Sequence, residues 1–209
     1  MKKILLIVGL LASTMTYAGS DGSNAAGTIH GGISSGLVFG GCKFSEGSDD
    51  PSKGGGFVTQ YGLRASYGIT NLISAGIFIR KEGAAYLFED FGSGIIAYSG
   101  YGFGLEGKFY AVNSETLNIY AAPAFGFTTA TLAGISSGLT STSISGLNYA
   151  LLAGGNYYFH EISGITLGAN FDLGLSGFSL GGKLPKDEKF TLSSTGLYIG
   201  VGVVAKLSM

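Results

Sequence analysis

Charged residues are scarce in this chain, and cysteine, proline and tryptophan are nearly or wholly missing. Lysine and arginine number 12 and aspartate and glutamate 13 in 209 residues, a net charge of −1. A net charge so close to zero gives no indication that the chain binds nucleic acid. The single cysteine, Cys42, cannot form an internal disulfide, and we expect an unpaired thiol in an outer loop. No Cys/His metal spacing and no Walker loop occur, so we expect neither metal nor cofactor.

Long apolar runs are also missing, except for one at the start of the chain. Lys2 and Lys3 precede an apolar stretch over residues 4–12, and a small-residue cleavage site follows at Thr16–Ala18. This order predicts a secretory signal peptide over residues 1–18, too short to span a bilayer comfortably. Residues 19–209 then form a single domain beyond the inner membrane. A buried first helix is the alternative interpretation.

The chain has an excess of glycine, 38 residues, and a regular alternation of apolar with small or polar residues. Over residues 197–207, for example, the odd positions hold Leu, Ile, Val, Val, Ala and Leu. A period of two predicts strands whose two faces meet different surroundings. The pattern indicates eight strands, at residues 27–40, 57–68, 72–81, 95–111, 117–129, 146–159, 165–176 and 194–208.

The charges inside these strands all lie on the glycine-rich face. They are Arg64, Arg80, Glu106, Lys108, Asp172 and Lys206. The opposite face is apolar and aromatic, and only Lys81, at a strand end, interrupts it. A soluble two-layer sandwich is the alternative, but a membrane barrel explains the pattern better, because its outside meets lipid and its inside is polar. Closure also pairs every backbone N–H and C=O, as lipid requires.

The connections between the predicted strands alternate in length. The sequences "GITN", "VNSET" and "HEISG" are tight turns, whereas the other connections are long: Gly41–Gly56, Glu82–Gly94, Ala130–Ser145 and Gly177–Ser193. Short periplasmic turns and longer outer loops are typical of outer-membrane barrels. The sequence leaves open whether the third long connection adds two strands, for a total of ten. Pro123 predicts a bulge in the fifth strand, because proline removes a ladder hydrogen bond.

The stretch "YGITNLISAGI", residues 67–77, resembles the periplasmic turns of small bacterial outer-membrane β-barrels of the OmpA/OmpX-like superfamily. The resemblance extends as a pattern over about 180 residues. It implies an all-β fold: an eight-stranded antiparallel transmembrane β-barrel in meander order, with short periplasmic turns and long extracellular loops. The chain ends in Met209, where such barrels usually end in an aromatic residue.

Three groups of residues suggest a chemical function, but each also has a purely structural interpretation. "GFGLEG", residues 102–107, has dinucleotide-binding spacing, yet no helix follows it, so the glycines belong to a strand. His30 with Ser34, and His160 with Glu161 and Ser163, could belong to a lipid-modifying enzyme. Both histidines fall near the periplasmic end, away from outer-leaflet lipid. The charges of the outer loops are expected to be solvated: Asp49, Asp50, Glu89, Asp90, Lys183, Lys186, Asp187, Glu188 and Lys189.

The resulting expectation is a non-enzymatic integral protein of the bacterial outer membrane, with a role in envelope structure or in adhesion and interaction through its loops. A narrow porin for small solutes and a lipid-modifying enzyme are the alternatives. Its partners would be outer-membrane lipid and an extracellular partner, and it would be a monomer. A lumen charge cluster of opposite signs should pair inside the barrel, because an unpaired buried charge is costly. Its members are Arg64, Glu106, Lys108, Asp172 and Lys206.

Overall fold

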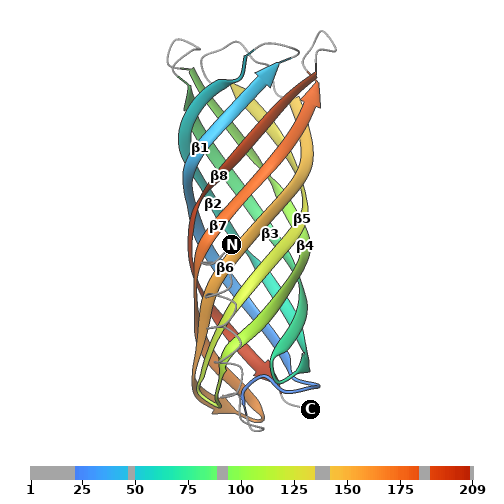
Figure 1. Ribbon diagram of the computed structural model, residues 1–209, viewed down its shortest axis with the longest axis vertical. Coiled ribbons are helices and arrows are strands. Elements are labelled where there is room, and N and C mark those ends of the chain that lie inside the picture. The colour runs from blue at the N-terminus through green and yellow to red at the C-terminus, as the bar shows by residue number, and fades with distance from the viewer. Residues whose placement is uncertain (1–21, 47–49, 89–93, 135–141, 184–188, 208–209) are drawn as a thin grey trace, which may run out of the picture.

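The computed structural model is a tall closed cylinder of antiparallel strands (Figure 1). It describes residues 22–46, 50–88, 94–134, 142–183 and 189–207. The strands are β1 (Ile29–Glu46), β2 (Ser52–Thr70), β3 (Ile73–Phe88), β4 (Gly94–Asn113), β5 (Leu117–Gly134), β6 (Thr142–Ile162), β7 (Ile165–Lys183) and β8 (Lys189–Leu207). Each strand pairs with its chain neighbours, and β1 pairs with β8, so the sheet closes. The predicted eight-stranded barrel is confirmed, and a ten-stranded ring is excluded. Within the described residues no helix is long and apolar enough to cross a membrane.

Short turns join the strands at one end of the cylinder, at residues 71–72, 114–116 and 163–164. All three lie within or next to the tight turns predicted from the sequence. In the last of them, Ser163 and Gly164 both have positive φ angles, 51° and 83°. Two successive positive φ angles give a turn whose twist matches that of the flanking strands. This end is the periplasmic end of the barrel.

Three register shifts occur, and all lie next to the periplasmic turns. They fall between Gly68 and Thr70, Tyr110 and Val112, and Tyr158 and His160. The prediction of a bulge at Pro123 was wrong. Pro123 stays in register opposite Leu151 of β6, and its β4 side loses pairing without any shift. The missing N–H of proline therefore interrupts one ladder but does not displace the strand.

The lower and middle barrel carries an apolar belt on its outside. On β8 the belt runs over the outward residues from Leu197 to Leu207, and on β7 from Ile165 to Leu175. Leucine, isoleucine, valine, phenylalanine and tyrosine side chains in this belt are largely exposed. So large an exposed apolar surface around a barrel is covered by lipid.

The two faces exchange character at the outer ends of the strands. Above the belt, outward positions of β8 hold Thr191, Ser193 and Thr195, while Leu192 on the lumen side is 0% exposed. Leu87 of β3 is an exposed apolar exception. The inversion explains why the outer connections are shorter than predicted. The strands extend beyond the predicted ends, and their apolar residues face inward there. The connections that remain between them are residues 47–51, 89–93, 135–141 and 184–188.

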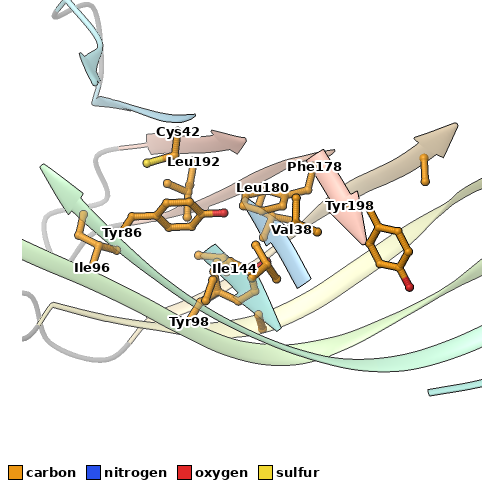
Figure 2. Close-up of a cluster of buried hydrophobic side chains, with 14 of the residues drawn as sticks. Val38, Cys42, Tyr86, Ile96, Tyr98, Ile144, Phe178, Leu180, Leu192 and Tyr198 are labelled. Carbon is orange, nitrogen blue, oxygen red and sulfur yellow. The ribbon is translucent and has the colours of Figure 1, made fainter. Parts of the chain in front are cut away.

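Figure 2 shows part of the buried lumen cluster, with labelled side chains from β1, β3, β4, β6, β7 and β8. We call the cluster members that fill the outer lumen the apolar plug. Its members are Val38, Cys42, Phe44, Val58, Ala84, Tyr86, Phe88, Ile96, Tyr98, Leu132, Ile144, Phe178, Leu180, Phe190 and Leu192. Aromatic rings meet within it: the centroids of Tyr98 and Phe178 are 5.3 Å apart in an edge-to-face arrangement. The plug resembles the core of a soluble protein.

Cys42 was expected in an outer loop, and this was wrong. It lies within β1, faces the plug and is 3% exposed. Burial raises the pKa of the Cys42 thiol to about 12. A buried thiol that stays protonated at neutral pH is a poor nucleophile.

Thiol labelling tests this position. Cys42 should not react with a membrane-impermeant maleimide in whole cells or in the folded purified protein, and should react after unfolding in urea. A Cys42→Ser, Thr191→Cys variant, with its thiol outward on β8, should label in whole cells. Rapid labelling of native Cys42 would return it to an accessible loop.

The inversion predicts opposite responses to arginine along one strand. Val201 is 58% exposed in the middle of the β8 belt, so Val201→Arg should lower the free energy of unfolding by about 2–4 kcal/mol. Thr191→Arg, outward on the same strand but above the belt, should change it by less than about 0.5 kcal/mol. Urea unfolding in lipid vesicles measures both variants. Equal losses would contradict the position of the belt edge.

Candidate functional site

The centre of the lumen holds an ion network contributed by three strands. Arg64 of β2 faces Asp172 of β7, with Nη1 2.7 Å from Oδ2, and Glu106 of β4, with Nη1 3.4 Å from Oε2. Lys108 of β4 approaches the other Glu106 oxygen, Nζ to Oε1, at 3.4 Å. The Asp172 side chain is fully buried and that of Glu106 is 4% exposed. Period-two alternation places these residues inward, and barrel closure brings distant strands together.

Tyrosine and asparagine side chains complete the network. Tyr120 OH donates to Asp172 Oδ1 at 2.9 Å, and Asn170 Nδ2 donates to Tyr120 OH at 2.7 Å. The Lys108 ammonium lies 4.8 Å from the centroid of the Tyr120 ring. Each carboxylate oxygen of Asp172 and Glu106 therefore has a partner. Satisfied networks of this kind hold a buried arrangement rigidly.

The fifth residue of the predicted lumen charge cluster lies apart from the other four. Lys206 of β8 has its ammonium 5.2 Å from the Tyr158 ring centroid, near the periplasmic end, and no ion pair joins it to the described residues. The structure thus brings together Arg64, Glu106, Lys108 and Asp172, and leaves Lys206 with an aromatic neighbour.

A second ion pair lies further toward the outer end and was missed by the sequence analysis. Arg80 Nε pairs with Glu82 Oε1, and Thr128 donates to Glu82 Oε2 at 3.3 Å. Glu82 had been assigned to an outer connection, but it lies in β3 and is 2% exposed. Because residues 80 and 82 lie on the same face of a strand, the sequence could have indicated that Glu82 faces inward with Arg80. Gly102 of "GFGLEG" faces this pair, and a Cβ there would lie 3.0 Å from Glu82 Oε1. The glycine provides room for the carboxylate.

The two histidines occupy different surroundings. His30 is buried low in the lumen, and its Nδ1 lies 2.8 Å from Tyr158 OH; no hydrogen bond joins it to Ser34 among the described residues. His160, Glu161 and Ser163 are exposed around the last periplasmic turn. No group of three or more metal-binding side chains occurs in the part of the chain that the structure describes.

Residues 22–28 cross the periplasmic mouth, and we call them the periplasmic cap. Ser23 Oγ donates to Asn118 Oδ1, and the backbone N–H of Asn24 donates to Asn113 Oδ1 at 2.8 Å. Asn113 Nδ2 returns a hydrogen bond to Asn24 O at 2.6 Å. Asn24 and Asn118 are 0% exposed. Period-two analysis could not predict this cap, since it has no regular secondary structure.

Three cavities among the described lumen residues are small. One beside Arg64 and Glu106 and one beside His30 and Lys108 measure about 20 Å³ each, and one beside Glu82 measures about 10 Å³. Each has room for about one water molecule. Among the residues predicted to be loop charges, Asp50 is exposed, Lys183 is the last residue of β7, and Lys189 is the first residue of β8. The remaining ones, Asp49, Glu89, Asp90, Lys186, Asp187 and Glu188, lie outside the described residues, as does the predicted signal peptide.

Comparison with known proteins establishes the type of fold. No family model matches the sequence, and no curated protein matches it. The structure is similar to the crystal structure of the outer membrane protein OprG from Pseudomonas aeruginosa, with a TM-score of 0.62 and 12% identity over 90% of this chain and 100% of that chain. This chain folds as a small bacterial outer-membrane β-barrel. The solid-state NMR structure of outer membrane protein AlkL is also similar, with a TM-score of 0.50 and 12% identity over 89% of this chain and 92% of that one. The fold and the apolar belt together place the barrel in the outer membrane of a Gram-negative bacterium.

The ion network predicts unequal costs for removing two lumen cations. Arg64→Met would leave two buried carboxylates short of a partner and should cost about 3–5 kcal/mol of unfolding free energy. Lys206→Met removes only a cation–π contact and should cost about 0.5–1 kcal/mol. Urea unfolding in vesicles gives both values. Equal costs would contradict the central position of Arg64.

Proposed function

We propose that the protein is a non-enzymatic, non-conducting integral protein of the outer membrane, which stabilises the envelope and holds its outer connections above the lipid. The observation that carries this proposal is the filled lumen. The periplasmic cap, the ion network and the apolar plug follow one another along the axis, and the three cavities found beside the lumen charges are near the size of one water molecule.

The apolar plug is the strongest argument against the alternative function of a narrow porin. Ion passage would require the whole plug to part, since Leu180 and Leu192 are 0% exposed and Tyr86 and Phe88 are 1% exposed. An apolar, close-packed interior also gives an ion no hydration or ligand. A conducting path would therefore need a different packing of the outer half.

The contacts of His30 give little support to the lipid-modifying enzyme. A histidine that acts as a base needs a nucleophile within hydrogen-bond reach, about 2.6–3.2 Å, and outer-leaflet lipid beside it. His30 instead contacts Tyr158 inside the periplasmic half of the barrel. The outer strand ends, rather than the lumen, are then the part of the protein available to an extracellular partner.

Single-channel recording tests the closed lumen. The purified wild-type protein in planar bilayers should give no steady conductance, whereas a known porin inserted in the same bilayers should. Stable, ohmic openings of the wild type would overturn the proposal in favour of the pore.

A second experiment tests the envelope role in cells. Loss of the protein should increase uptake of large antibiotics that an intact outer membrane excludes, and the wild-type gene should restore exclusion. Arg64→Met, which weakens the barrel without altering the outer connections, should restore it incompletely. Unchanged permeability in the deletion strain would leave only an interaction role for the protein.

A further inference from the structure

Three successive rows of outward side chains on β2, β3 and β4 mark where the lipid ends. Residues in each row lie opposite one another in the register. The first row is apolar and more than half exposed: Leu63, Ile79 and Phe103. The second is Tyr61, Lys81 and Tyr101. The third bears hydroxyl groups or no side chain: Thr59, Gly83 and Ser99. The change within two rows puts Lys81 at the edge of the hydrocarbon.

Lys81 is flanked by hydroxyl donors on both sides. Tyr61 and Tyr101 are 54% and 55% exposed, and no hydrogen bond ties either hydroxyl to another described residue. Residues directly opposite on a sheet have Cβ atoms about 4.5–5.5 Å apart, so long side chains on these three strands are close enough to contact one ligand between them. An ammonium offers three donors and each phenol one. The row offers several donors but contains no anion.

Among the described strands, the protein provides no counter-charge on this surface. Above the belt, no carboxylate faces outward from the described strands, whereas several lysines do: Lys43, Lys53, Lys81, Lys183 and Lys189. No ion pair joins Lys81 to a described residue. A cation facing lipid is unfavourable within the hydrocarbon and becomes tolerable near the interface. An anionic group of the membrane would give Lys81 the counter-charge that the described strands lack.

We propose that Lys81, Tyr61 and Tyr101 bind a phosphate group on the headgroup of a glycolipid in the outer leaflet. Phosphate oxygens accept several charge-assisted hydrogen bonds at once, which suits an ammonium between two hydroxyls. The apolar row directly below would contact the acyl chains of the same molecule. A lipid therefore satisfies both rows, and a free phosphate only one.

Titration with a bisphosphorylated lipid A tests the site, with binding followed by native mass spectrometry of the protein in neutral detergent. Lys81→Met should weaken binding about fivefold, the equivalent of roughly 1 kcal/mol for a lysine beside an anionic lipid surface. Lys81→Arg should keep most of the affinity. Lys189→Met, an equal change of charge at the outer end of β8, is the matched control and should bind as the wild type does.

Chemically dephosphorylated lipid A should bind the wild type and Lys81→Met equally. Millimolar inorganic phosphate should not compete with the phosphorylated lipid. Equal losses in Lys81→Met and Lys189→Met would mean diffuse charge attraction and overturn the site. Competition by inorganic phosphate would contradict the proposal that the ligand is a lipid. If Lys81→Met also binds the dephosphorylated lipid more weakly than the wild type does, the phosphate is not the group that Lys81 recognises.

A variant that keeps the charge guards against misfolding of Lys81→Met. The double variant Tyr61→Phe, Tyr101→Phe preserves the rings and the lysine, so the barrel should retain its heat-dependent gel mobility. Loss of the two hydroxyl donors should weaken binding of phosphorylated lipid A about threefold. Full affinity in this folded variant would overturn the role of the tyrosines.

Discussion

The pairing of β1 with β8 is the contact on which the rest of the structure depends. It runs from Ile29 opposite Leu207 to Glu46 opposite Phe190, so it seals the wall over its whole height. Lipid offers no hydrogen-bond partner to a free strand edge, and only a closed ring removes both edges. A ring of eight strands encloses a space that side chains can just fill. Every layer of the lumen must therefore fill the same narrow width, although the chemistry changes along the axis.

Glycine allows large side chains to share that width. A Cβ at Gly154 would overlap Asp172 Oδ1, and one at Gly104 would lie 2.7 Å from Phe78 Cζ. Lumen glycines therefore stand opposite the arginine, aspartate and aromatic side chains that close the centre. Above the belt the outside of the wall can be polar, because water rather than lipid surrounds it. There the barrel is built as a soluble protein is, with its apolar side chains inside.

The strands could be predicted where their apolar residues face outward to lipid. The prediction failed at the outer strand ends, where the apolar residues face inward. Eight strands, the three tight turns and the inward parity of Arg64, Glu106, Lys108 and Asp172 all followed from a period of two. The outer strand ends were assigned to loops because apolar residues such as Phe44 and Leu192 move to the other face there. Cys42 and Glu82 were misplaced for the same reason. Which charges meet depends on strand tilt and closure, so the isolation of Lys206 and the periplasmic cap lay beyond sequence reasoning.

The two faces of the wall exchange roles at the outer edge of the lipid. Nitroxide labels at successive outward positions of β8 would test it by electron paramagnetic resonance, with oxygen reporting lipid and a soluble nickel complex reporting water. If the faces exchange in this way, oxygen should dominate from Val203 to Leu197, and the nickel complex should dominate at Thr195, Ser193 and Thr191. Oxygen dominance that continues to Thr191 would contradict it, because the outer half would then lie in the membrane with its polar face toward lipid.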